Sequence, residues 1–213
     1  MNIPAADPLP GAMARRRLVL AAVPLAAGLG ACAASSPAPL LLALPAAADA
    51  APPAAAPPAA AAAPPLLVVR RVGVPEYLLA RRVRFRSDAS TVAEWPNAFW
   101  AERLEIGVTR EFAAALRARL PGWDVCDGSC GDAAPARVLQ LELTALDFLR
   151  DARRLQARGR LTLYGGGAVL RTQPLAADID AAADSPQGQA QAIAEALGRL
   201  ADAAAPPIAA ARP

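Results

Sequence analysis

Cys32, Cys126 and Cys130 are the side chains best suited to covalent chemistry in this chain, which contains no histidine. Histidine is the commonest general base near neutral pH and the commonest metal ligand. Its absence removes the usual partner of a catalytic nucleophile and the usual ligand of a metal ion. We therefore expect cysteine chemistry of two kinds, lipid attachment and disulfide formation, and we expect neither a metal nor a cofactor.

Cys32 ends a segment with the plan of a secretory signal. Residues 15–17 are three arginines, residues 18–29 are apolar, and small residues precede the cysteine. The apolar run is shorter than the roughly 20 residues that span a bilayer. The sequence Leu-Gly-Ala-Cys at 29–32 resembles a lipobox, whose cysteine receives lipid in bacterial lipoproteins. We expect residues 1–31 to be a lipoprotein signal peptide and Cys32 to be lipidated; an ordinary signal peptide with an incidental cysteine is the alternative.

The residue after Cys32 bears on the membrane that the protein reaches. Ala33 stands where the usual sorting rule would place Asp for inner-membrane retention, so we expect the outer membrane, with the protein on its periplasmic face. Lipid chains hold a protein at a membrane surface without spanning it. Met13 is an alternative start to Met1, because the leader begins equally well there.

The charge of the mature chain gives no support to nucleic-acid binding. Every basic side chain is Arg, and three of the arginines lie in the leader together with Asp7. Removal of residues 1–31 lowers the formal net charge from +3 to +1. We expect no nucleic-acid partner.

Cys126 and Cys130 form an even pair in a compartment that oxidises thiols. The turn-forming residues Asp-Gly-Ser lie between them, which favours a small-loop disulfide; free thiols are the alternative. A metal site would need further ligands, and neither a histidine nor a third nearby cysteine supplies them.

Hydroxyl nucleophiles lack the setting of a hydrolase. Four serines are candidate nucleophiles, and none has a Gly-x-Ser-x-Gly context or a histidine partner. They are Ser87, Ser90, Ser129 and Ser185. We expect no catalytic residues and a protein that is not an enzyme.

We expect the chain to be divided into four segments. After the signal peptide, we expect residues 32–65 to be a lipidated N-terminus with an Ala/Pro-rich tether, residues 66–205 to be the folded domain, and residues 206–213 to be a tail. Residues 46–65 are almost entirely Ala and Pro, a composition that blocks a stable helix and favours an extended, semi-stiff chain. The predicted role of the tether is to hold the domain away from the membrane.

Hydrophobic periodicity predicts an α+β domain. A helix introduced by Pro96-Asn97 and ended by Pro121-Gly122 carries an apolar stripe, and a second helix begins near Ser185 and ends at Pro206-Pro207. The stripe of the first helix, which we expect in the core, is Trp100, Leu104, Val108, Phe112, Leu116 and Leu120. Expected strands cover residues 66–69, 82–85, 138–148 with a bulge at Ala145, 155–164 and 168–179. They form an antiparallel or mixed β-sheet with both helices packed on one face.

This ordered set of elements resembles the ABC-type transport auxiliary lipoprotein family, the PqiC-like partners of MCE-type lipid transport systems. The resemblance rests on the lipobox, the leucines at 40–44, the Ala/Pro stretch, Val-Pro-Glu-Tyr-Leu at 74–78 and Phe-Trp-Ala-Glu-Arg-Leu at 99–104. Residues 81–86 depart from the family pattern, which usually reads Arg-Pro-Gln-Ile-Val there.

The resemblance implies a non-enzymatic outer-membrane lipoprotein. Such a protein docks against an MCE-domain protein and an ABC transporter, helps phospholipid movement or envelope integrity, and forms homo-oligomers in some members. Arg82, Arg84 and Arg86 are candidate contacts for acidic partners or lipid phosphates, since guanidinium binds phosphate bidentately; a solvated charged face is the simpler interpretation. The alternative function is a periplasmic chaperone that binds lipid or glycan in an apolar groove between helix and sheet.

Overall fold

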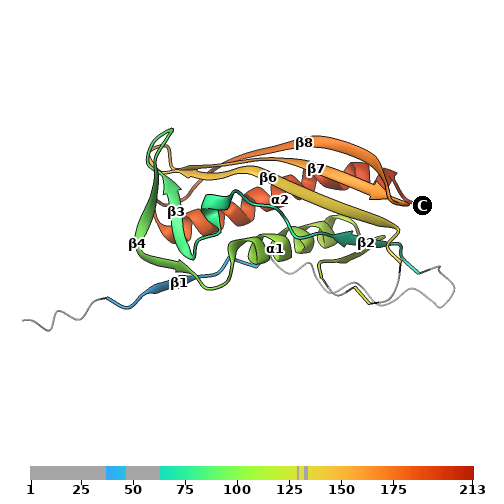
Figure 1. The fold of residues 1–213 in the computed structure, drawn as a ribbon, viewed down its shortest axis with the longest axis horizontal. Helices are drawn as coiled ribbons and strands as arrows, with labels where there is room; N and C mark the ends of the chain where they lie inside the picture. Colours follow the sequence, from blue (N-terminus) through green and yellow to red (C-terminus); the bar gives the residue numbers. More distant parts are fainter. Residues whose placement is uncertain (1–36, 47–62, 129, 132–133) are drawn as a thin grey trace, which may run out of the picture. The chain divides into compact units, whose positions relative to one another are not determined.

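A computed structural model describes residues 37–46, 63–128, 130–131 and 134–213. Residues Pro39–Pro213 form one compact unit. Within the described residues, the chain forms eight strands and two α-helices in an α+β arrangement, which confirms the predicted fold class (Figure 1). The elements in chain order are β1 (Leu40–Leu42), β2 (Leu66–Val69), the 3-10 turn η1 (Glu76–Leu78), β3 (Arg82–Arg86), β4 (Val92–Trp100), α1 (Leu104–Arg119), β5 (Asp124–Cys126), β6 (Arg137–Leu149), β7 (Arg154–Gly165), β8 (Ala168–Asp180) and α2 (Pro186–Ala210).

The strands form one mixed sheet around β6. Along one edge, β6 pairs in parallel with β2 near its start and with β3 at its end; along the other it pairs antiparallel with β7. β8 continues the antiparallel meander beyond β7, while β4 and β1 extend the sheet beyond β3 and β5 extends it beyond β2. The sheet is therefore antiparallel in its long meander and parallel where short strands join it.

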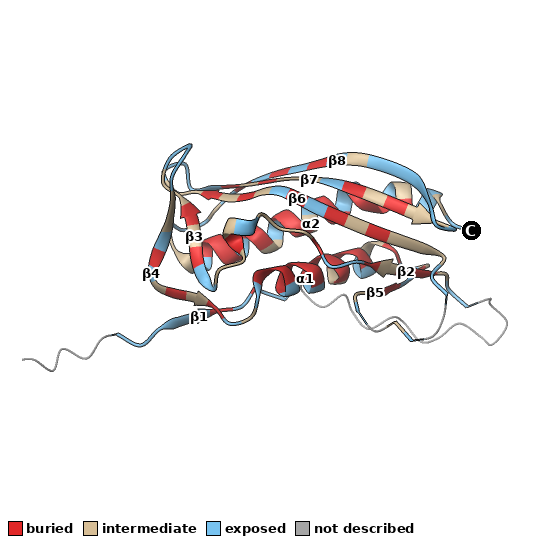
Figure 2. Ribbon diagram, in the orientation of Figure 1, coloured by how far each residue is buried: buried red, intermediate tan, exposed pale blue. Residues whose placement is uncertain are grey.

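Both helices lie on the same side of the β6–β8 meander, as predicted (Figure 1). The buried residues of Figure 2 follow the inward stripes of the helices and the inward positions of the strands. The stripe expected from the sequence is in the core: Trp100, Leu104, Val108, Phe112, Leu116 and Leu120 are all at most 3% exposed. Burial of this apolar surface is the main force that holds the helices to the sheet.

The meander also follows the sequence pattern. The register of β6 against β7 shifts between Leu143 and Ala145, where the bulge was expected. Gly166 and Gly167 have positive φ angles of 57° and 82° in the β7–β8 turn, a conformation that glycine adopts at little cost. The three glycines at 165–167 thus belong to a hairpin.

The segment around Pro96 differs from the prediction. It lies in strand β4, and α1 starts only at Leu104. The register between β3 and β4 shifts at this point, and Asn97 has a positive φ of 54°. A bulge accommodates Pro96, which has no N–H to give to the ladder. Trp100 keeps its predicted place in the core but reaches it from the end of a strand.

Helix α2 passes through Pro206 and Pro207, so the predicted stop and the tail beginning at residue 206 were wrong. Proline at these positions cannot donate to the carbonyl groups of Asp202 and Ala203 four residues earlier. The side-chain amide of Gln173 on β8 donates to the Ala203 carbonyl oxygen at 3.3 Å. The continued helix also buries Ile208 completely. Tertiary contacts thus outweigh the local cost of proline.

The N-terminal boundary of the domain was also placed wrongly, because Leu40–Leu42 is a strand of the sheet. β1 pairs in parallel with the end of β4, and Leu42 and Leu44 are buried. The Ala/Pro stretch therefore connects β1 to β2 and does not separate the domain from Cys32. Residues 47–62 of that stretch lie outside the described part of the chain.

Candidate functional site

Strand β3 carries the three arginines that the sequence singled out. Val83 and Phe85 alternate with them and are buried, which turns Arg82, Arg84 and Arg86 to the opposite face. The structure therefore does bring the three guanidinium groups together in one row, which we call the arginine row.

Each member of the arginine row contacts a carboxylate. Arg82 and Arg84 share Glu94 on β4, with N–O distances of 3.3 and 3.0 Å. Arg86 pairs with Asp147 on β6 at 3.3 Å. Three guanidinium groups thus face two carboxylates, and the row keeps one net positive charge. Glu94 and Asp147 could not be found from local sequence pattern, because they come near β3 only through the pairing of β3 with β4 and β6.

Tyr77, from η1, fixes this row to the sheet. Its hydroxyl donates to Asp147 Oδ1 at 2.6 Å, and burial together with this bond raises the pKa of Tyr77. The Arg86 guanidinium lies 5.1 Å from the Tyr77 ring centre, and Arg84 donates to the Tyr77 carbonyl oxygen at 2.8 Å. The Tyr of the Val-Pro-Glu-Tyr-Leu segment therefore has a positioning role here.

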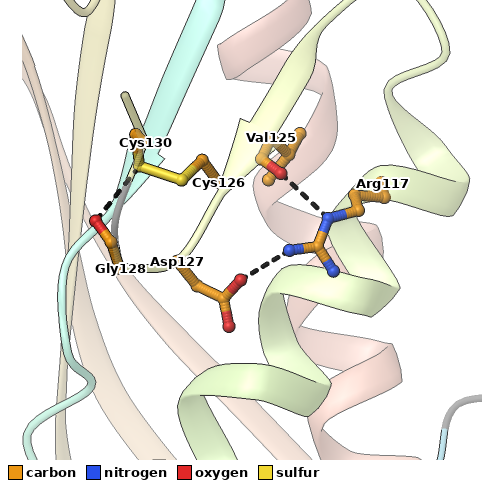
Figure 3. The surroundings of a disulfide bond; sticks show 6 residues. All are labelled: Arg117, Val125, Cys126, Asp127, Gly128 and Cys130. Carbon is orange, nitrogen blue, oxygen red and sulfur yellow. Dashed lines mark hydrogen bonds and ion pairs between the residues drawn. A yellow bond between two sulfur atoms is a disulfide. The ribbon is translucent and has the colours of Figure 1, made fainter. Parts of the chain in front are cut away.

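Cys126 and Cys130 are joined by a disulfide with an S–S distance of 1.99 Å (Figure 3). The bond closes the loop that follows β5. The Cys130 sulfur lies 3.3 Å from the Gly128 carbonyl oxygen, a contact without a donated proton because the sulfur is bonded. Gly128 has a φ of 140°, so the loop turns at a position that favours glycine.

Arg117 connects this loop to α1. Its Nε donates to the Val125 carbonyl oxygen at 2.8 Å, and its Nη2 pairs with Asp127 at 2.5 Å (Figure 3). The loop borders an open surface hollow of about 500 Å³, which Arg70, Arg71 and Asp127 also line. Apolar side chains of β2 and α1 line it as well, so the hollow is open to solvent and of mixed polar and apolar character.

Between the helices and the β6–β8 meander, the described residues leave no apolar groove of the kind expected for a lipid- or glycan-binding chaperone. Phe112, Leu116, Phe148 and Leu197 fill that space and are completely buried. A gap between α2 and strands β7 and β8 is too small for a water molecule. Close packing of this kind leaves no room for an acyl chain without rearrangement of the core.

Ser90 and Ser185 have structural roles. Asp88 accepts hydrogen bonds from the Ser90 and Thr91 amides at 2.8 Å and from Ser90 Oγ at 3.0 Å, which lowers the pKa of Asp88 to about 2. Ser185 Oγ accepts from the Gly188 amide at 3.0 Å and caps α2. Ser129 lies outside the described residues.

The part of the chain that the structure describes offers neither a metal site nor a membrane-spanning helix. No group of three or more His, Cys, Asp or Glu side chains is placed to hold a metal ion there. No helix in the same residues combines the length and apolar character needed to cross a membrane. Cys32, the expected lipidation site, lies outside the described residues.

A model of the family described as the ABC-type transport auxiliary lipoprotein component matches residues 48–205. The chain belongs to this family. Its membership makes the protein a lipoprotein auxiliary of an ABC transport system, with a membrane-anchored, periplasmic location, and confirms the resemblance inferred from the ordered motifs. Comparison with curated proteins gave no match.

Solved structures share the fold of this family member. The crystal structure of an uncharacterized protein matches with a TM-score of 0.65 and 19% identity, over 80% of this chain and 99% of that one. A Xanthomonas campestris protein of the DUF330 family matches with a TM-score of 0.55 and 11% identity, over 68% of this chain and 84% of that one. A PelC dodecamer from Paraburkholderia phytofirmans reaches only 0.38, with 14% identity over 66% and 90% of the two chains, and this similarity is too low to bear on assembly.

Proposed function

We propose that the chain is a non-enzymatic outer-membrane lipoprotein that serves an MCE-type lipid transport system and helps to maintain the cell envelope. The observation that carries this proposal is the family match over residues 48–205. The lipobox at 29–32 and Ala33 support an anchor at Cys32 in the outer membrane. The partners in this proposal are an MCE-domain protein and the ABC transporter of the same system, and a homo-oligomer is part of it.

The packing of the domain supports a docking role over a carrier role. The space between the helices and the β6–β8 meander is filled by buried side chains, as described above, and the hollow beside β2 and α1 is open to solvent. Both features favour a docking surface over an enclosed lipid site. The arginine row, with one positive charge in excess, is the candidate contact for acidic groups of a partner or for lipid phosphates.

Fractionation tests the anchor and the membrane. Wild-type protein, Cys32→Ala and the double variant Cys126→Ser/Cys130→Ser would be expressed in the source cells, and inner and outer membranes separated on a density gradient. We expect wild type and the double variant in the outer membrane with a lipid-modified mass, and Cys32→Ala without that mass. Recovery of wild type in the inner membrane would contradict the outer-membrane location.

Affinity purification after chemical crosslinking tests the partners. We expect the wild-type protein to retain an MCE-domain protein together with an ABC ATPase and permease. Retention of an ABC system without an MCE-domain protein would contradict the MCE assignment. Stoichiometric lipid on the purified protein in native mass spectrometry would instead favour the chaperone function.

A further inference from the structure

The position of β1 limits how far the domain can lie from its anchor. Cys32 and Leu40 are separated by only seven residues, and the Ala/Pro stretch lies after β1 in the chain. A fully extended chain spans at most about 3.5 Å per residue, so Leu40 lies within about 28 Å of Cys32. Because β1 is paired with β4 and Leu42 is buried, this limit applies to the sheet itself.

The surface at this end of the sheet is apolar. β1 is an edge strand. Leu41 lies on the face opposite the buried Leu42 and is 60% exposed, whereas Leu40, on the face of Leu42, is 37% exposed. Leu41 is the register partner of Phe99 on β4, and Phe99 is in turn the partner of Arg82 on β3. The Arg82 guanidinium lies 5.0 Å from the Phe99 ring centre. A leucine, an aromatic ring and a guanidinium thus form one row across three strands.

The charges around this row suit a phospholipid surface. No charged side chain occurs between residues 33 and 46, so none must be desolvated at the approach to the bilayer. Arg82 and Arg84 share the single carboxylate of Glu94, which leaves positive charge beside the apolar residues. Surfaces that bind in the interface plane combine these features: apolar and aromatic side chains next to arginines that reach lipid phosphates.

We propose that the β1 edge of the sheet rests on the phospholipid surface in which Cys32 is anchored. Leu41 enters the boundary between headgroups and acyl chains, Phe99 lies beside it, and Arg82 faces the phosphates. The β7–β8 turn, at the other end of strands that are 12 and 13 residues long, then points away from the membrane (Figure 1). This inference rests on the proposed lipidation of Cys32.

Tryptophan quenching in membranes tests this orientation. Lipidated full-length Leu41→Trp would be reconstituted into vesicles of phosphatidylethanolamine and phosphatidylglycerol whose acyl chains are brominated near the glycerol. The matched control is Val169→Trp at the β7–β8 turn, because Val169 is also an apolar strand residue and is 58% exposed. The native residues Trp95, Trp100 and Trp123 are buried, so the wild-type protein gives the background. Circular dichroism would show that each variant retains the fold.

We expect brominated lipid to reduce the emission of Leu41→Trp well below that in unbrominated vesicles, and to leave Val169→Trp at the wild-type level. Absence of quenching in a lipidated Leu41→Trp that co-floats with vesicles would overturn the orientation while the proposed function stands. Quenching of Val169→Trp without quenching of Leu41→Trp would also overturn the proposed orientation. A blue shift of Leu41→Trp without quenching, dependent on protein concentration, would mean that a second protein copy covers β1 and would also overturn it. Absence of lipid on Cys32 in the intact mass would overturn both proposals.

Discussion

Trp95 on β4 donates its indole N–H to the side-chain oxygen of Gln189 on α2 at 2.7 Å inside the core. The amide nitrogen of Gln189 donates to the Arg84 carbonyl oxygen on β3, also at 2.7 Å. Gln189 is only 1% exposed, and both ends of its amide have partners. One buried side chain therefore connects the helix to the two strands that carry the arginine row and the β1 edge, as expected of a satisfied buried polar group.

Replacement of Gln189 with Leu should destabilise the protein. The change leaves the Trp95 N–H and the Arg84 carbonyl without partners in the core, at a cost of about 2–3 kcal/mol in the free energy of unfolding. Urea denaturation measures it. Gln191→Leu, on the exposed side of the same helix, is the matched control and should change stability little. Equal effects of the two variants would contradict the assigned role of Gln189.

Ile208 should stabilise the domain although it follows two prolines in α2. Its side chain is completely buried, and Ile208→Ala should cost about 2–4 kcal/mol through lost apolar contact and the cavity left behind. Ile106→Ala is the control, because Ile106 is 39% exposed and its truncation should cost much less. If the two substitutions lower the thermal midpoint equally, residues 206–210 do not form part of the folded core.

Reduction of the disulfide should have a moderate effect. The bond closes a loop of only five residues, so the chain-entropy model assigns it about 2 kcal/mol. Cys126→Ser/Cys130→Ser should therefore lower stability by no more than about that amount without loss of the fold. Urea unfolding of wild type with and without reductant is the internal control. A reductant effect that persists in the double variant would contradict the pairing.

Arg82 and Arg84 should differ in their contributions to stability. Arg84 binds Glu94 through Nε and Nη2 and also donates to the Tyr77 carbonyl oxygen, whereas the more exposed Arg82 makes one longer contact with Glu94. We expect Arg84→Gln to cost about 1 kcal/mol more than Arg82→Gln, since exposed ion pairs contribute little. Arg82→Gln then becomes the cleaner probe of partner contact, because a loss of pull-down would not be due to unfolding.

Asp88 should give the protein a stability that is lost in acid. Its pKa of about 2 in the folded state lies below the ordinary aspartate pKa of 3.8. Its contribution to stability is therefore complete above the higher pKa and disappears as the pH falls through the lower one. Asp88→Asn keeps an acceptor oxygen but does not titrate. The difference in thermal midpoint between wild type and Asp88→Asn should therefore shrink from about pH 5 to about pH 2. A difference independent of pH would contradict this prediction.

The sequence alone determined the features that depend on local pattern. Alternation in residues 138–148 and 155–164 predicted the meander, because side chains of a strand alternate between faces wherever it pairs. The spacing of four residues between Leu104, Val108, Phe112 and Leu116 likewise predicted the buried stripe of α1. Candidate chemistry was equally local: the lipobox and the pair Cys126/Cys130 are read from neighbouring residues.

Only the tertiary structure decided the features that depend on distant partners. Leu40–Leu42 is too short to be a strand by pattern, and it becomes one because β4 offers a free edge and the core accepts Leu42. The extension of α2 through two prolines depends on Gln173 and on burial of Ile208. Strand pairing places Glu94 and Asp147 beside the arginine row, and the 3-10 turn η1 places Tyr77 there. Local propensity amounts to less than about 1 kcal/mol for an ordinary residue and to about 3 kcal/mol for a proline inside a helix. Burial and pairing across the fold override it at these places.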